Sequence, residues 1–177
     1  IPLNSNTFLF TGSSLSDGLY KITAVYSYIS GIKNSADINI AVDKTPPKVD
    51  LIIKPELFSP DGDGEKDNLF ITYSINDFSD IDSYTIRIYR LFEEGKKSVK
   101  PFKVFQFSKP YGKTITNQLQ WDGVGDESNS LVDSATDYQL VLTAVDKAGN
   151  EINVSQNFTV DILIMKTDIG YKIIINS

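Results

Sequence analysis

Apolar residues alternate with polar residues along much of the chain, and this period of two is typical of β-strands that bury one face. In residues 84–91, Tyr84, Ile86 and Ile88 fall on one face, while Thr85 and Arg87 fall on the other. The same pattern predicts further strands at residues 48–54, 69–75, 102–107, 115–121, 137–145 and 151–160. Apolar residues do not follow a helical period over any useful length, so we expect an all-β fold.

Short polar turns separate the predicted strands. Glu93-Glu94-Gly95-Lys96-Lys97 is typical of a hairpin tip, and Asp146-Lys147-Ala148-Gly149-Asn150 of a tight turn between the last two strands. The strand that ends in Trp121-Asp122-Gly123 is followed by a loop of acidic and small residues. Seven short strands with turn signals at short intervals are typical of an immunoglobulin-like β-sandwich. We therefore predict one complete sandwich over residues 47–162.

Residues 1–46 contain three further strand-like runs, at residues 7–10, 19–28 and 36–42. Three short strands cannot cover both faces of a sheet, so we interpret this segment as the C-terminal half of a similar domain. Three of its residues recur 118 positions later, which supports a repeat: Tyr20, Gly31 and Val42 return as Tyr138, Gly149 and Val160. The chain thus looks like a piece of a longer protein, and the exposed edges of a half-sandwich are expected to aggregate or to pair with another chain.

A linker and a tail flank the complete domain. Asp43-Lys44-Thr45-Pro46-Pro47 is typical of a stiff linker, because proline lacks the N–H that a β-ladder needs and favours an extended backbone. We expect it to space two end-to-end modules. In the tail, residues 163–177, apolar runs near 162–165 and 171–175 flank a polar turn, which predicts a hairpin that leads into a further segment.

The composition permits a packed core and removes several kinds of chemistry. The 177 residues are 41% hydrophobic and 11% aromatic, and they include neither Cys nor His. Thiol nucleophiles, Ser-His-Asp triads and zinc sites with sulfur or nitrogen ligands are therefore excluded. The 17 basic and 23 acidic residues give a net charge of −6, which argues against nucleic acid as the main partner. No apolar run is long enough for a transmembrane helix, so we expect no membrane span.

Several motifs resemble those of a known family. Residues 58–67, Phe-Ser-Pro-Asp-Gly-Asp-Gly-Glu-Lys-Asp, are similar to the opening of the bacterial Ig-like domain at the end of the flagellar hook-capping protein. A related gliding-motility C-terminal type ends many exported bacterial proteins. Trp121-Asp122-Gly123, Asp137-Tyr138 and the turn at 146–150 resemble the close of that domain, and residues 42–47 resemble its inter-domain joint. Thr136 stands where the family usually has glycine.

The resemblance implies tandem Ig-like domains in an exported bacterial protein of the cell envelope, in the periplasm or at the cell surface or outer membrane. Such domains serve as spacers, assembly modules, and secretion or anchoring tails, and seldom as catalysts. We therefore expect a non-enzymatic structural or protein-interaction module. Its expected partners are other domains of the same protein and a protein of the envelope. Residues 161–175 resemble the joint that in some envelope proteins precedes a peptidoglycan-binding domain.

The sharpest chemical candidate is the acidic loop at residues 61–67. With Gly64 at the sharp turn of a calcium loop, four residues take liganding positions, Glu65 through its backbone carbonyl and the others through their carboxylates: Asp61, Asp63, Glu65 and Asp67. Ser59 and Phe70 hold the first and last positions, so any site is weak or is completed from elsewhere, for example by Asp122 or Asp126. The alternative is a turn in which the Asp side chains bind their own backbone. The expected cofactor is therefore none or Ca²⁺, and a calcium-dependent adhesive or carbohydrate-binding module is the competing function.

Four residues are predicted to be structural anchors: Trp121, Tyr138, Gly149 and Tyr20. A Trp at the end of a strand is more often a core residue with its indole N–H bonded to a loop carbonyl than a platform for a sugar ring. Tyr138 and Tyr20 have the position of corner tyrosines, which pin a strand crossing. Gly149 has the position of the turn residue in the final hairpin.

No catalytic residue is predicted. Paired carboxylates such as Asp80 with Asp82, or Asp122 with Asp126, could serve hydrolysis, yet acidic loops are common in an acidic protein. A stretch of lysines interleaved with aromatic residues could bind a single-stranded nucleic acid or an acidic polymer: Lys96, Lys97, Lys100, Lys103, Lys109 and Lys113. We favour the interpretation that these lysines line an edge strand, where they oppose aggregation.

Overall fold

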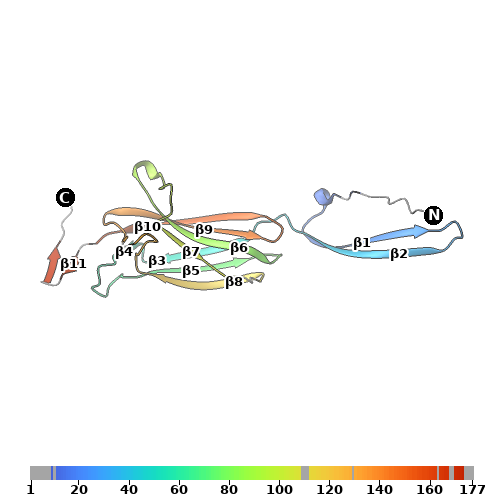
Figure 1. Cartoon of the computed structure of the whole chain (residues 1–177). Coiled ribbons are helices and arrows are strands. Elements are labelled where there is room, and N and C mark those ends of the chain that lie inside the picture. Colours follow the sequence, from blue (N-terminus) through green and yellow to red (C-terminus); the bar gives the residue numbers. More distant parts are fainter. Residues whose placement is uncertain are drawn as a thin grey trace. The chain divides into compact units, whose positions relative to one another are not determined.

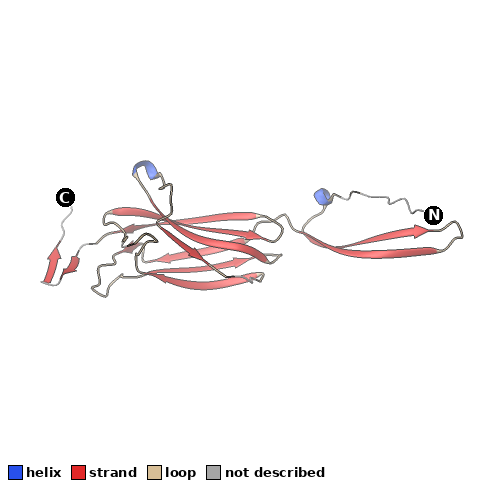
Figure 2. Cartoon of the chain, in the orientation of Figure 1, coloured by secondary structure: helices blue, strands red, loops and turns tan. Residues whose placement is uncertain are grey.

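The computed structural model describes residues 9, 11–108, 112–128, 130–162, 164–167 and 170–173, with side chains up to residue 162. These residues lie mostly in β-strands, and their helical segments are 3-10 turns of three residues each, Gly12–Ser14 (η1) and Glu93–Gly95 (η2) (Figure 2). The prediction of an all-β fold is confirmed. The chain divides into two units, Ile1–Thr45 and Pro46–Ser177.

The first unit is an antiparallel hairpin of strands β1 (Gly18–Ser27) and β2 (Lys33–Val42) (Figure 1). Gly31 in the turn has a φ of +83°, a conformation that glycine adopts without steric cost. None of the described residues of this unit is buried, because two strands alone enclose no core. The strands predicted at 19–28 and 36–42 coincide with β1 and the greater part of β2. The strand predicted at 7–10 falls mostly outside the described residues.

The second unit has a five-stranded sheet with the order β4-β10-β9-β6-β7. Its strands are β4 (Leu57–Phe58), β6 (Ile81–Arg90), β7 (Lys103–Gln106), β9 (Thr136–Asp146) and β10 (Glu151–Val160). A three-stranded sheet has the order β3-β5-β8, with β3 (Lys48–Lys54), β5 (Leu69–Asn76) and β8 (Thr114–Trp121). β11 (Ile164–Thr167) and β12 (Gly170–Ile173) form a separate pair. Among the described strands, only β4 and β10 pair in parallel.

The two larger sheets share one hydrophobic core (Figure 1). In β6, Tyr84, Ile86 and Ile88 are buried while the residues between them are partly exposed, as the alternation predicts. Ile71 on β5 and Leu140 on β9 are fully buried and reach the core from opposite sheets. Burial of one such side chain stabilises the fold by about 1.5–3 kcal/mol, so the alternating pattern determines which face of each strand turns inward.

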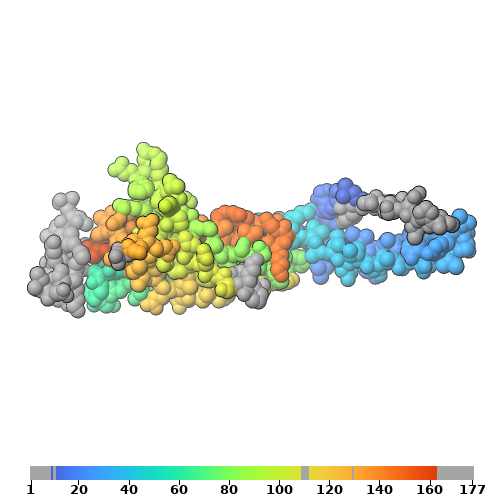
Figure 3. Space-filling model, in the orientation of Figure 1, coloured from blue at the N-terminus to red at the C-terminus, as the bar shows by residue number. Residues whose placement is uncertain are grey.

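Strand β4 is absent from the sequence prediction. Its two residues are too few to show a period, and its pairing with β10 depends on a segment about 100 residues later in the chain. Leu57 and Phe58 nevertheless alternate, since Leu57 is 40% exposed and Phe58 is fully buried. The segment that carries η2 projects from the surface of this unit (Figures 1 and 3).

The hairpin β1–β2 and the hairpin β9–β10 have the same register. Each of the ten residue pairs of β1 and β2 becomes a pair of β9 and β10 when 118 is added to both numbers, as in Tyr20 with Ile40 and Tyr138 with Phe158. The turns agree as well, because the Gly31 N–H bonds to the carbonyl oxygen of Tyr28, as that of Gly149 does to the carbonyl oxygen of Asp146. The predicted repeat is therefore present in the backbone.

Candidate functional site

The end of strand β8 is fixed by an aromatic cluster around Trp121. The Trp121 side chain is 3% exposed, and its indole N–H donates a hydrogen bond of 2.8 Å to the carbonyl oxygen of Val124. Its ring lies 5.7 Å from that of Phe58 and 6.2 Å from the rings of both Phe102 and Phe158. A ring enclosed in this way has no free face for a sugar, so the geometry favours the role of a core anchor.

Tyr138 pins the start of strand β9. Its side chain is fully buried, and its hydroxyl accepts a hydrogen bond of 3.0 Å from the backbone N–H of Asp133. Burial raises the pKa of Tyr138, because the charged phenolate is poorly solvated there. Tyr20 holds the matching position in the first unit, where its hydroxyl donates a bond of 2.8 Å to the carbonyl oxygen of Ser16. Both tyrosines thus tie a strand to the chain just before it.

The turn between β9 and β10 depends on Gly149 and on a buried acid. Gly149 has a φ of +92°, which a residue with a Cβ rarely adopts. Asp146 is 1% exposed, and its carboxylate accepts hydrogen bonds from the backbone N–H of Asn150 at 2.9 Å and from the Asn150 amide at 2.8 Å. The sequence prediction did not include Asp146 among the anchors, although the Asp-x-x-Gly-Asn spacing was the available signal.

Three of the four predicted calcium ligands lie together in the acidic loop. Carboxylate oxygens of Asp61, Asp63 and Asp67 lie within 4.8 Å of one another. The Glu65 carboxylate is not part of this group, and the contribution of the Glu65 backbone carbonyl stays a prediction. Among the described residues, neither Asp122 nor Asp126 completes the group. The predicted ligand set is therefore brought together in part, and the two acids considered for its completion lie elsewhere.

The same carboxylates hold the loop in shape. Asp67 accepts backbone N–H groups with both oxygens, from Gly62 at 2.7 Å and from Gly64 at 2.8 Å. Asp61 accepts the N–H of Asp63 at 3.1 Å, and Asp63 accepts the N–H of Glu65 at 2.7 Å. This network is the self-bonded turn considered as the alternative to a metal loop. Each oxygen has a further lone pair, so three carboxylates remain able to contact a hard cation.

The other carboxylates considered for chemistry have separate partners. Asp80 forms an ion pair of 2.9 Å with Lys147, and Asp122 accepts the backbone N–H of Val124 at 3.1 Å. Asp126 pairs with Lys103 at 2.9 Å, and this hydrogen bond lowers the pKa of the Asp126 carboxyl. A general acid needs a shift in the opposite direction.

The lysine-rich stretch spans strand β7, an edge of the five-stranded sheet, but of its described lysines only Lys103 lies on that strand. Its described lysines engage several different groups. Lys96 pairs with Glu94 at 2.9 Å, Lys97 lies 5.2 Å from the ring centroid of Tyr89, and Lys113 lies 5.1 Å from that of Phe78. The position of Lys109 lies outside the described residues.

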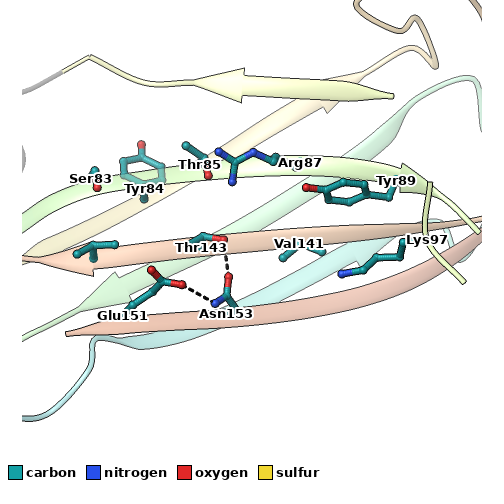
Figure 4. A pocket seen from close by; sticks show the side chains of 11 residues that line it. Ser83, Tyr84, Thr85, Arg87, Tyr89, Lys97, Val141, Thr143, Glu151 and Asn153 are labelled. Atoms are coloured by element: carbon teal, nitrogen blue, oxygen red, sulfur yellow. Dashed lines mark hydrogen bonds between the residues drawn. The ribbon is translucent and has the colours of Figure 1, made fainter. Parts of the chain in front are cut away.

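A shallow hollow of about 470 Å³ lies on the outer face of β6, β9 and β10 (Figure 4). Polar side chains line it and bond to one another, since Thr143 donates to Asn153 at 2.5 Å and Asn153 donates to Glu151 at 2.8 Å. Arg87 and Tyr89 extend along the same face. Small-molecule sites are usually concave and largely apolar, whereas an open polar sheet face suits a broad macromolecular surface.

No protein-family model matches the chain, and no curated protein matches it. A solved structure with partial similarity is Spo0M, a sporulation control protein from Bacillus subtilis, with a TM-score of 0.41 and 14% sequence identity. The match covers 67% of this chain and 50% of the Spo0M chain, so the chain spans about half the length of that protein. Within the part of the chain that the structure describes, no helix has the length and apolar character needed to cross a membrane.

Proposed function

We propose that residues 47–162 form an Ig-like β-sandwich of the hook-capping or gliding-motility C-terminal type. The chain then acts as a non-enzymatic structural and protein-interaction module of an exported bacterial cell-envelope protein, in the periplasm or at the cell surface. The motifs at residues 58–67 and 121–123 support this proposal, together with the corner tyrosine Tyr138 and the final turn at Gly149. Its partners would be neighbouring domains and an envelope protein that contacts the polar face of β6, β9 and β10.

The parallel pairing of β4 with β10 is the observation that supports a mechanical role. β4 follows β3 near the start of the second unit and β10 lies near its end, and the backbone bonds between the two segments include Thr159 N–H to Glu56 O at 3.0 Å and Asp161 N–H to Phe58 O at 3.0 Å. Tension on the two ends pulls parallel neighbours in opposite directions along their length. The bonds are then loaded together instead of one after another, and such an arrangement resists stretching.

A proline at position 161 tests this role, because it removes the N–H that bonds to Phe58 and lies just beyond the last residue of β10. Asp161→Ala is the matched control, since it removes the carboxylate and keeps the N–H. With handles on cysteines placed at Lys48 and after the last residue, we expect Asp161→Pro to unfold about fivefold faster than Asp161→Ala at constant force. That factor corresponds to the loss of about 1 kcal/mol for one hydrogen bond. Equal unfolding rates for the two variants would contradict a force-bearing role.

The competing function is a calcium-dependent adhesive or carbohydrate-binding module, and the three clustered carboxylates of Asp61, Asp63 and Asp67 favour it. A bound ion would stabilise the folded chain by about 2.7 kcal/mol at a calcium concentration one hundred times the Kd. Melting curves at increasing calcium concentration would then shift upward, and the shift would vanish in Asp63→Asn. A melting temperature that stays constant up to millimolar calcium would exclude this function.

A further inference from the structure

The hairpin β1–β2 has one polar face and one apolar face. Lys21, Thr23 and Asp37 lie on the polar face, where Asp37 forms an ion pair of 2.7 Å with Lys21 and accepts a hydrogen bond of 2.7 Å from Thr23. The residues between them point to the other side and are nearly all apolar: Tyr20, Ile22, Ala24, Tyr26, Ala36, Ile38, Ile40 and Val42. An apolar face of this kind is the inner face of a sheet.

The matching face of β9–β10 is buried along β9 and buried or partly buried along β10. Leu140, Leu142 and Ala144 on β9 are 0% exposed, whereas Tyr26, which corresponds to Ala144, is 50% exposed. Ile38 on β2 is 60% exposed. The two hairpins share register, turn and corner tyrosine, so they differ in what covers them and not in their own conformation. No described residue of the apolar face of β1–β2 is buried: Tyr20, Ile22, Ile40 and Val42 are partly exposed, and Tyr26 and Ile38 are at least half exposed.

The second unit shows which elements provide that cover. Strand β6 pairs antiparallel with the free edge of β9, placing Ile86 opposite Leu142 and Ile88 opposite Leu140. Strand β4 pairs with the other edge of the hairpin, and the sheet β3-β5-β8 lies across its inner face. All these strands precede β9 in the chain, between residues 48 and 121.

We infer that β1–β2 is the closing hairpin of a second two-sheet unit, and that its other strands come from the segment of the same polypeptide that precedes residue 4. With the offset of 118, the counterparts of residues 48–121 fall at or before position 3, because 121 − 118 = 3. The counterpart of β6 pairs antiparallel with the free edge of β1, and its inward residues lie opposite Ala24 and Ile22. The counterpart of the β3-β5-β8 sheet covers Tyr20, Ile22 and Ile40.

The same polypeptide is a better source than a second copy of the chain. In the second unit every strand that covers the hairpin comes from the residues directly before it, and an offset of 118 is about the length of one such unit. A second copy would place two identical hairpins face to face. It would leave both β1 edges without a strand in the position of β6.

Amide hydrogen exchange on two forms of the protein tests this inference. One is the chain of 177 residues, and the other is the same chain extended by its natural preceding segment of about 75 residues, a length that corresponds to β3–β8. In the extended form, the edge amides of β1 are expected to exchange at least about a hundredfold more slowly, because they then open only when the completed unit unfolds. Unchanged exchange would overturn the inference. Protection of β1 in the shorter chain that is lost on dilution would also overturn it, because a second copy would then be the occupant.

Two adjacent substitutions distinguish a hairpin whose apolar face is covered from a hairpin whose β1 edge is paired while that face stays exposed. Ile22→Asn places an amide on the inner face, and Thr23→Asn places the same group on the outer face one residue later. In the extended protein, we expect Ile22→Asn to abolish the slow exchange of β1 and Thr23→Asn to retain it. Equal protection in both variants would show that the face is not enclosed and would overturn the inference.

Discussion

The hydroxyl of Tyr138 offers a direct measure of how much the corner at the start of β9 stabilises the second unit. Tyr138→Phe removes one oxygen atom and keeps a ring that stacks on Phe158 at 5.7 Å. The Asp133 N–H then loses the acceptor that it reaches at 3.0 Å. A buried polar group left without its partner costs about 1–3 kcal/mol. For a unit of this size we expect a loss of about 1.5 kcal/mol and a fall in Tm of about 5 °C.

Urea denaturation followed by the fluorescence of Trp121 measures this loss, because the chain contains a single tryptophan, which lies in the core of the same unit. Tyr89→Phe is the matched control. The Tyr89 ring is outward on β6 and lies beside Lys97, and removal of its hydroxyl is expected to change the stability by less than about 0.5 kcal/mol. A Tyr138→Phe variant as stable as Tyr89→Phe would refute the corner bond as a source of stability.

The pH dependence gives an independent check. Burial raises the pKa of Tyr138 in the folded state above its ordinary value of about 10. Below pH 10 both states hold the proton and the stability is unaffected. As the pH rises through 10 toward the folded pKa, the unfolded state releases the proton first, so the stability of the wild type falls. Tyr138→Phe lacks this contribution, and its deficit relative to the wild type should therefore shrink above pH 10. A constant deficit would contradict the raised pKa.

Two further substitutions test the packing and the charge of the same unit. Gly125→Ala places a Cβ 2.4 Å from the Ser130 hydroxyl oxygen and 3.0 Å from the Phe102 carbonyl oxygen, and we expect a loss of about 1–3 kcal/mol in urea denaturation. Gly112→Ala, where a Cβ meets open space, should be close to neutral; equal losses would refute the crowding. In the wild type, the ion pair with Lys103 lowers the pKa of the Asp126 carboxyl, and Asp126→Asn removes this ion pair. The contribution of Asp126 is present above pH 3.8 and is lost as the pH falls below it, so an acid titration of stability should be flatter in Asp126→Asn than in the wild type.

The alternation of apolar residues predicted the long strands because burial of one face imposes a period of two. Strand β6 shows this clearly, since Ile86 and Ile88 are fully buried while Arg87 between them is not. Strand β4 lacks that signal. It has two residues and depends on a parallel partner that is remote in sequence, so its existence is a property of the assembled unit.

The candidate site was predictable to the extent that it depends on local spacing. The Asp-x-Asp pattern placed Asp61 and Asp63 close together, because side chains in a glycine-containing turn converge. The separation of the Glu65 carboxylate from this cluster and the bonding of Asp67 to two backbone N–H groups follow from the path of the loop, which includes a positive φ of 57° at Lys66. A non-glycine residue in that conformation leaves little trace in a linear pattern.

The pairing of β4 with β10 also governs the order of events during synthesis. Phe58 leaves the ribosome about 100 residues before Val160, the residue it pairs with, and sequence-distant contacts of this kind form slowly. Strand β4 therefore stays unpaired with β10 until β10 has emerged from the ribosome. A nascent chain that stops short of Phe158 has no partner for Leu57, and the ring of Phe58 then lacks the neighbouring ring of Phe158. The second unit is therefore complete only when β10, near its end, has paired with β4, near its beginning.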